Sequence, residues 1–276
     1  FVFAHHVIMQ FLNQIQFGDT SLTLKILFDY KKLCRPLTMV LLLVISLSSN
    51  ARPIGHAPWS GDTFENSPCN GPRENFGPFD YLKRTQLPNE LGIVERYHFS
   101  LEVEQLIKGQ TNKSPLPDIG YTLRAWPNHH RALYSLIRHR ISLWPKKYPV
   151  RYIPAECYLQ RAIKFSPKDA TVYMLYGILL HRTNHKDKAL KQYEIALDID
   201  PSNVQAKYNL GLLLVDLKQY QTAKKYAHEL YSRGFPLPGL KDKLKKAGKW
   251  KKNDEEAITS KSSGVPKVEQ QPDHKT

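Results

Sequence analysis

The sequence has none of the short patterns that mark common catalytic and metal sites. It contains no G-x-S-x-G segment, no Gly-rich phosphate loop and no paired metal-ligand motif, which are the patterns of serine hydrolases, nucleotide-binding loops and zinc enzymes. We therefore expect no catalytic residues, no metal and no cofactor. Long hydrophobic runs are also missing. The one extended apolar run covers residues 37–47, whereas a membrane-spanning helix needs about 20 apolar residues.

Acidic residues are scarce beside basic ones, with 25 Asp and Glu against 40 Lys and Arg, which gives a formal net charge of +15. A basic surface attracts nucleic acid, anionic lipid or acidic protein. Much of this charge lies in one segment, Lys241 to Lys252, which holds seven lysines and one aspartate. We interpret that segment as a solvated tail and expect no nucleic-acid partner. The alternative is a weak, salt-sensitive contact with an anionic membrane surface through Lys241 to Lys252.

The N-terminal part has the three-part pattern of a secretory signal. Three basic residues precede the apolar run at 37–47, and the small residues Ser49 and Ala51 follow it. We expect residues 1–51 to be an upstream segment and signal peptide, and the mature protein to be exported, most simply to a periplasm. The alternative is an uncleaved N-terminal segment that holds the protein at the membrane.

Cysteine is rare, with three in the chain. Cys34 lies before the apolar run and would be lost with the signal, which leaves Cys69 and Cys157 as an even pair in an oxidising compartment. We predict a disulfide that ties the N-terminal region to the first helical pair. Two unpaired, buried thiols remain the alternative.

Residues 52–127 are predicted to form a loop-rich region with one short helix, and residues 52–92 within it an extended arm. Turn-forming Pro, Gly and Asn are dense at the start of this region, yet it also holds aromatic residues that disordered segments lack. These aromatics are Trp59, Phe64, Phe76, Phe79 and Tyr81. The short helix is predicted within "HFSLEVEQLIKG", beginning after Ser100 and ending at Gly109. We expect the arm to lie over a helical body.

A 34-residue repeat begins further along the chain. Residues 170–203 align with 204–237, so that Gly177 recurs as Gly211 and Ala189 as Ala223. Stepping backward, "AECYLQRAIKFSP" matches a second helix, and "NHHRALYSLIRHR" matches a first helix with Asn128 as its N-cap. The repeats predict an all-α fold, a short α-solenoid of about three helical hairpins plus a capping helix over 128–250. A disordered polar tail is predicted over 251–276.

The repeat unit resembles the tetratricopeptide repeat. The positions that carry the resemblance are Tyr173, Tyr176, Gly177, Leu180, Ala189, Tyr193, Ala196 and Pro201. The arrangement of arm and repeats also resembles uncharacterised exported bacterial proteins with such repeats. The repeat family implies a scaffold for protein–protein or peptide binding, in which the first helices line a groove that holds a partner segment.

The resemblance implies which residues line that groove. They are Thr171, Met174, Ile178, His181, Gln205, Tyr208, Asn209, Leu212 and Val215. Asn209 falls where some members of the family use an asparagine to hold the terminal carboxylate of a peptide. The accompanying basic positions are not matched in the neighbouring repeats, so this ligand stays open.

An enzyme or metal-binding protein with a site around His98, His129 and His130 is the alternative function. His129 and His130 are adjacent, so on a helix they point in different directions, whereas a helical zinc site uses ligands at i and i+4. We favour a structural role for the pair, in which one histidine packs against the arm and the other caps a helix or faces solvent.

Overall fold

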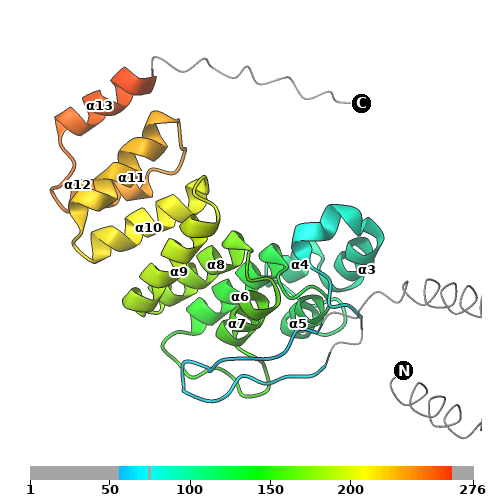
Figure 1. Cartoon of the computed structure of the whole chain (residues 1–276). Coiled ribbons are helices and arrows are strands. Elements are labelled where there is room, and N and C mark those ends of the chain that lie inside the picture. Colours follow the sequence, from blue (N-terminus) through cyan, green and yellow to red (C-terminus); the bar gives the residue numbers. More distant parts are fainter. Residues whose placement is uncertain (1–55, 74–75, 263–276) are drawn as a thin grey trace, which may run out of the picture. The chain divides into compact units, whose positions relative to one another are not determined.

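The structure is a computed structural model that describes residues 56–73 and 76–262. The predicted signal peptide and the last residues of the predicted tail lie outside these ranges. Over the described residues the chain is helical, and the hairpins follow one another in chain order (Figure 1). The elements are η2 (Tyr81–Gln86), α3 (Pro88–His98), α4 (Leu101–Glu104), α5 (Leu116–Ala125), α6 (His130–Leu143), α7 (Ala155–Phe165), α8 (Ala170–Arg182), α9 (Lys186–Ile199), α10 (Val204–Asp216), α11 (Tyr220–Ser232), α12 (Gly239–Lys246) and α13 (Lys252–Ser262).

Three helical hairpins form the body of the protein, as the repeats predicted. Helix α6 pairs with α7, α8 with α9 and α10 with α11. The first helices begin at side-chain caps. Asp169 accepts from the Thr171 amide at the start of α8, and Asn203 accepts from the Ala206 amide at the start of α10. The predicted capping helix is α12, whose buried Leu240 packs on α10 where Gly211 leaves room. The all-α solenoid is therefore confirmed.

Small residues let the paired helices approach closely. At Gly177 on α8, an added Cβ atom would lie 2.5 Å from Cε1 of Tyr193 on α9, so only glycine leaves space for that ring. Ala189, Ala196 and Ala223 are fully buried at corresponding contacts. The small residues of the repeat therefore mark the positions where the two helices of a hairpin pack most closely.

The region before the repeats holds more helix than the single short one predicted. Helices α3 and α5 carry a proline in the first turn, where its missing N–H costs nothing and its fixed φ suits a helix. These prolines signal helix starts, not loops. The predicted helix after Ser100 shrinks to the four residues of α4, which is followed by Leu106 at φ 64°.

The predicted disordered tail is also wrong over its first part, because α13 begins at Lys252. Buried Asp254 makes ion pairs with Lys224 at 2.7 Å and with His228 at 3.0 Å, both on α11. Acidic residues in the first turn also suit the positive end of a helix dipole. Residues 263–276 lie outside the described part of the chain.

Two glycine substitutions test this packing. Replacing Gly177 by alanine forces the Tyr193 ring to move, which costs about 1–3 kcal/mol, against a gain of about 1 kcal/mol in helix propensity. We expect Gly177→Ala to lower the free energy of unfolding. Gly92 on α3 has no atom within 4 Å of an added Cβ, so Gly92→Ala should raise it by up to about 1 kcal/mol. Chemical denaturation measures both, and a stabilised Gly177→Ala would contradict the packing.

Candidate partner-binding groove and the strap on the opposite helices

A cavity of about 850 Å³ lies along the first helices of the hairpins, and we call it the groove. Its wall is formed by α6, α8 and α10, with contributions from α9, the loop before α12 and α12 itself. Six of the residues predicted to line a groove do line it. They are Met174, Ile178, His181, Gln205, Asn209 and Leu212.

The other three predicted residues lie elsewhere. Tyr208 is buried, with its ring centroid 5.0 Å from that of Phe235, and Val215 is buried in the core. Thr171 lies at the start of α8, where its amide bonds to the cap, and it does not line the groove. Tyr208 is displaced inward because the loop before α12 covers it.

Several groove residues were missed by the sequence analysis. They are Tyr134, Leu175, Arg182, Lys186, Tyr193, Asp216, Leu237 and Lys243. Tyr134 lies on α6, whose alignment with the other first helices predicts such a position. Lys243 comes from α12, whose docking against α10 has no signal in the repeat pattern.

An ion-pair cluster forms part of the groove wall. Asp216 accepts hydrogen bonds from Nε2 of His181 at 2.8 Å and from Nζ of Lys243. Burial alone would raise the pKa of Asp216, but these two bonds hold it below its usual value. The pKa of His181 lies below its usual value, because the effect of burial outweighs the opposing effect of the hydrogen bond with Asp216. Asp216 is therefore an anion that two donors from different helices already satisfy.

The groove also contains two cations that make no ion pair among the described residues. Arg182 and Lys186 line the cavity, and neither makes an ion pair with any residue that the structure describes. The floor contains Tyr193, whose buried hydroxyl has no hydrogen-bond partner among the described residues. The groove thus combines apolar side chains with unneutralised positive charge.

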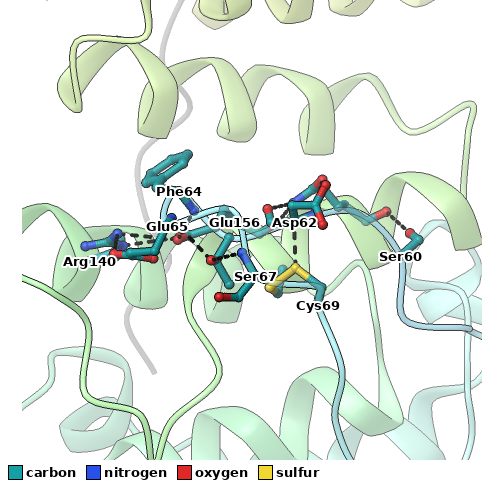
Figure 2. The surroundings of a disulfide bond; sticks show 11 residues. Ser60, Asp62, Phe64, Glu65, Ser67, Cys69, Arg140 and Glu156 are labelled. Carbon is teal, nitrogen blue, oxygen red and sulfur yellow. Dashed lines mark hydrogen bonds and ion pairs between the residues drawn. A yellow bond between two sulfur atoms is a disulfide. The ribbon is translucent and has the colours of Figure 1, made fainter.

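The arm crosses the second helix of the first hairpin, and we call its residues 57–69 the strap. Gln160 on α7 binds the strap backbone, since its Nε2 donates to the Asp62 carbonyl at 2.8 Å. Figure 2 shows this crossing and the disulfide, which lies between Ser60 and Arg140 in this view. Cys69 and Cys157 form that disulfide, and their Cα atoms are 5.4 Å apart. The link joins positions 88 residues apart.

A buried arginine binds the turn within the strap. Arg140 on α6 is fully buried, and its Nε donates to Glu156 Oε2 at 3.2 Å while Nη2 donates to Glu65 Oε1 at 3.0 Å (Figure 2). Its guanidinium also lies over aromatic rings, those of Phe64, Trp144 and Tyr148. One cation therefore links the strap, α6 and α7.

The strap leaves the groove open. No described residue of the arm, 56–73 or 76–92, lines the groove. The strap contacts α7 and the turn before α9, where Phe64 stacks on His185 with ring centroids 4.4 Å apart. The later part of the arm packs instead around Trp126 in a separate small core. The arm therefore covers the helical body, as predicted, without filling the groove.

Substitutions at the buried arginine test the strap. Arg140→Met leaves the Glu156 carboxylate buried without its cation, which costs about 3–5 kcal/mol. The double variant Arg140→Met/Glu156→Gln removes that stranded charge, so we expect it to recover part of the loss. Denaturant unfolding measures both under oxidising conditions. A double variant less stable than Arg140→Met would contradict this account.

The three candidate histidines are bound to three different carboxylates. His98 Nδ1 lies 3.0 Å from Asp118, and His130 Nε2 lies 2.8 Å from Asp169. His129 Nε2 lies 3.1 Å from Glu95. Within the described residues, no group of three or more His, Cys, Asp or Glu side chains is placed to hold a metal ion. The arrangement joins arm, α5, α6 and α8 through separate pairs.

His129, and not Asn128, caps α6. The Nδ1 atom of His129 accepts from the Ala132 amide at 3.2 Å, so Nε2 carries the proton and donates to Glu95. The Asn128 side chain instead accepts from the Tyr81 amide and donates to Asp169. The predicted roles of packing and capping thus fall on one histidine, which is fully buried.

The capping role of His129 predicts a pH dependence of stability. Burial lowers the pKa of His129 from 6.5, despite the opposing hydrogen bond with Glu95. As the pH falls, the unfolded chain therefore binds a proton at this histidine at a higher pH than the folded chain does. The contribution of neutral His129 to stability is complete above about pH 6.5 and is lost as the pH falls below that value. His129→Asn keeps a capping oxygen and does not titrate. We expect its melting temperature to fall less than that of the native protein between about pH 7.5 and 5.5.

Residual pH dependence in His129→Asn has an identified source, because burial also lowers the pKa of His139, His181 and His185. A melting temperature that falls as steeply in the variant as in the native protein would contradict the capping role.

The lysine-rich segment, Lys241 to Lys252, forms ion pairs and buried contacts that a solvated tail would lack. Lys241 and Lys245 pair with Glu255, and Lys243 pairs with Asp216. Trp250 is buried and donates its indole N–H to Glu255 at 2.7 Å, so it does not face outward. No helix in the described residues is long and apolar enough to cross a membrane.

Comparisons with known proteins give one family match and two partial matches to other proteins. The tetratricopeptide repeat family matches residues 170–203 and 204–231. The chain is 43% identical over 61 residues to Protein O-mannosyl-transferase TMTC4 of Mus musculus, covering 22% of this chain and 8% of that protein. It is 31% identical over 71 residues to the Peroxisomal targeting signal receptor of Candida glabrata, covering 26% of this chain and 12% of that protein. This chain thus matches only a small part of each relative's length.

Proposed function

Because residues 170–231 form tetratricopeptide repeats, we propose that this protein is a scaffold that binds a protein or peptide partner in the groove. The observation that carries the proposal is the open groove along α6, α8 and α10, which no described arm residue lines. A partner segment laid there would contact Met174, Ile178 and Leu212. A pre-formed apolar cavity with a few polar groups is the usual form of a binding site.

The two relatives support a role in binding another protein more than they support a catalytic activity. The name of the Candida glabrata protein describes a receptor for a targeting signal, and its match covers 26% of this chain. We therefore propose that the repeats of this chain recognise a segment of another protein. The name of the Mus musculus protein describes a transferase, but the match covers 8% of it, so we carry no activity across.

We further propose that the protein acts after export. The disulfide between Cys69 and Cys157 supports an oxidising compartment, and the sequence predicts a signal peptide before it. The strap would then be fixed by the bond in the working protein. A periplasm is the compartment we propose.

A matched pair of substitutions tests the groove. Ile178→Lys places a charge in the groove, whereas Ile195→Lys places it on α9, where Ile195 is 36% exposed and does not line the groove. We expect purified native protein to retain a stoichiometric partner from the exported fraction of its source cells. Ile178→Lys should lose that partner, and Ile195→Lys should keep it.

Circular dichroism checks that both variants fold. Equal retention of the partner by both variants, or equal loss, would show that binding uses another surface.

A further inference from the structure

The charge of the groove suggests what its partner carries. Arg182 at the end of α8 and Lys186 at the start of α9 both line the cavity, and neither has a carboxylate partner among the described residues. The one acidic residue that lines the groove, Asp216, is already paired with the cation Lys243 and accepts a hydrogen bond from His181. Two positive charges are therefore left for a ligand, and complementary charge across an interface favours the matching partner over others.

A buried donor lies beside these cations. The Tyr193 hydroxyl is fully buried without a hydrogen-bond partner among the described residues. Tyr193 lines the floor of the groove, and the positive charge of Arg182 acts on its phenol. A buried hydroxyl without a partner destabilises the free protein, and a ligand oxygen that accepts its hydrogen would remove that cost.

The rest of the wall is apolar. Met174, Ile178, Leu212 and Leu237 line the groove, and Leu237 is 44% exposed. A ligand with charge alone would leave these side chains uncovered. A free anion or a polyanion therefore fits less well than a peptide with apolar residues on both sides of an acidic one.

The geometry at Asn209 argues against a terminal carboxylate as the main anchor. Its side-chain nitrogen donates to the Gln205 carbonyl within α10 at 2.9 Å. One of the two amide hydrogens is thereby used within the helix, which leaves Asn209 a single N–H for a carboxylate. The unneutralised cations lie instead at the end of α8 and the start of α9, in the wall of the groove and not at Asn209.

We propose that the groove selects a partner segment with an internal acidic side chain between apolar residues. Arg182 and Lys186 receive the carboxylate, and the Tyr193 hydroxyl donates to it once these two flexible side chains turn toward the ligand. The apolar neighbours of the acid cover Met174, Ile178 and Leu212. This inference rests on the proposed function and specifies the chemistry of its ligand.

The probe is a set of nine-residue peptides, acetylated and amidated so that only side chains carry charge. The central residue is Glu, Gln or Lys, and the flanks sample Leu, Ile, Phe and Met. Fluorescence anisotropy measures their binding to the full chain with the disulfide intact. We expect the best Glu peptides to bind about 10-fold more tightly than their Gln counterparts, as charge-assisted hydrogen bonds imply, and the Lys peptides to bind least.

Three variants test which side chains cause the preference for Glu peptides. Arg182→Gln and Tyr193→Phe should each weaken the Glu peptides by up to about 10-fold and weaken the Gln peptides less, because a neutral amide oxygen is the poorer acceptor. Lys188→Gln is the matched control, because Lys188 is an exposed lysine on α9 that does not line the groove. Lys188→Gln should bind the Glu and the Gln peptides as tightly as the native protein does.

The inference is overturned if Glu and Gln peptides bind equally, if no peptide binds, or if the preference for Glu survives in both Arg182→Gln and Tyr193→Phe. Binding of a lipid vesicle or an RNA in place of the peptides also overturns it. The pull-down with Ile178→Lys is independent of these peptides, so the groove can hold as a partner site while its acidic preference fails.

Discussion

The buried guanidinium of Arg140 is the interaction on which the arrangement of arm and repeats depends. It is fully buried, and it joins Glu65 on the strap to Glu156 on α7. A buried charge needs its partners in place, since removing one leaves the other uncompensated. The disulfide from Cys69 to α7 fixes the far end of the same strap. Together they hold the strap against the second helix of the first hairpin, and the face formed by the first helices stays available.

That division of faces connects fold to function. Close contacts such as Gly177 against Tyr193 set the spacing between α8 and α9, and the first helices then line one continuous groove. The charged residues of the groove come from the repeats and from the capping helix α12, which pack against each other. Arg182 belongs to the repeat, whereas Lys243 comes from the capping helix and neutralises Asp216. Docking of α12 therefore decides which cations remain for a partner.

Much of the fold was predictable, because a 34-residue period fixes both helices of a hairpin and their contact. The same period placed Ile178 and Leu212 in the groove wall. It could not place Tyr208, which the loop before α12 covers, and it could not predict Arg140, since a buried arginine looks like a surface residue in sequence. The prolines in the first turns of α3 and α5 were misleading for a related reason, because proline is common both in loops and at the first positions of helices. Long-range pairs such as His129 with Glu95 leave no local signal.

The central claim is that the strap lies on the second helices and leaves the groove open, and intramolecular photo-crosslinking tests it most directly. A benzoylphenylalanine replaces Ile178 in the groove, or Val150 as the control, because Val150 lines a small cleft with strap residues such as Thr63 and Ser67. The purified protein is irradiated and digested, and the linked peptides are identified by mass spectrometry. We predict links from position 150 to residues 57–69 and none from position 178 to residues 56–92. Links from position 178 to the arm would show that the protein fills its own groove.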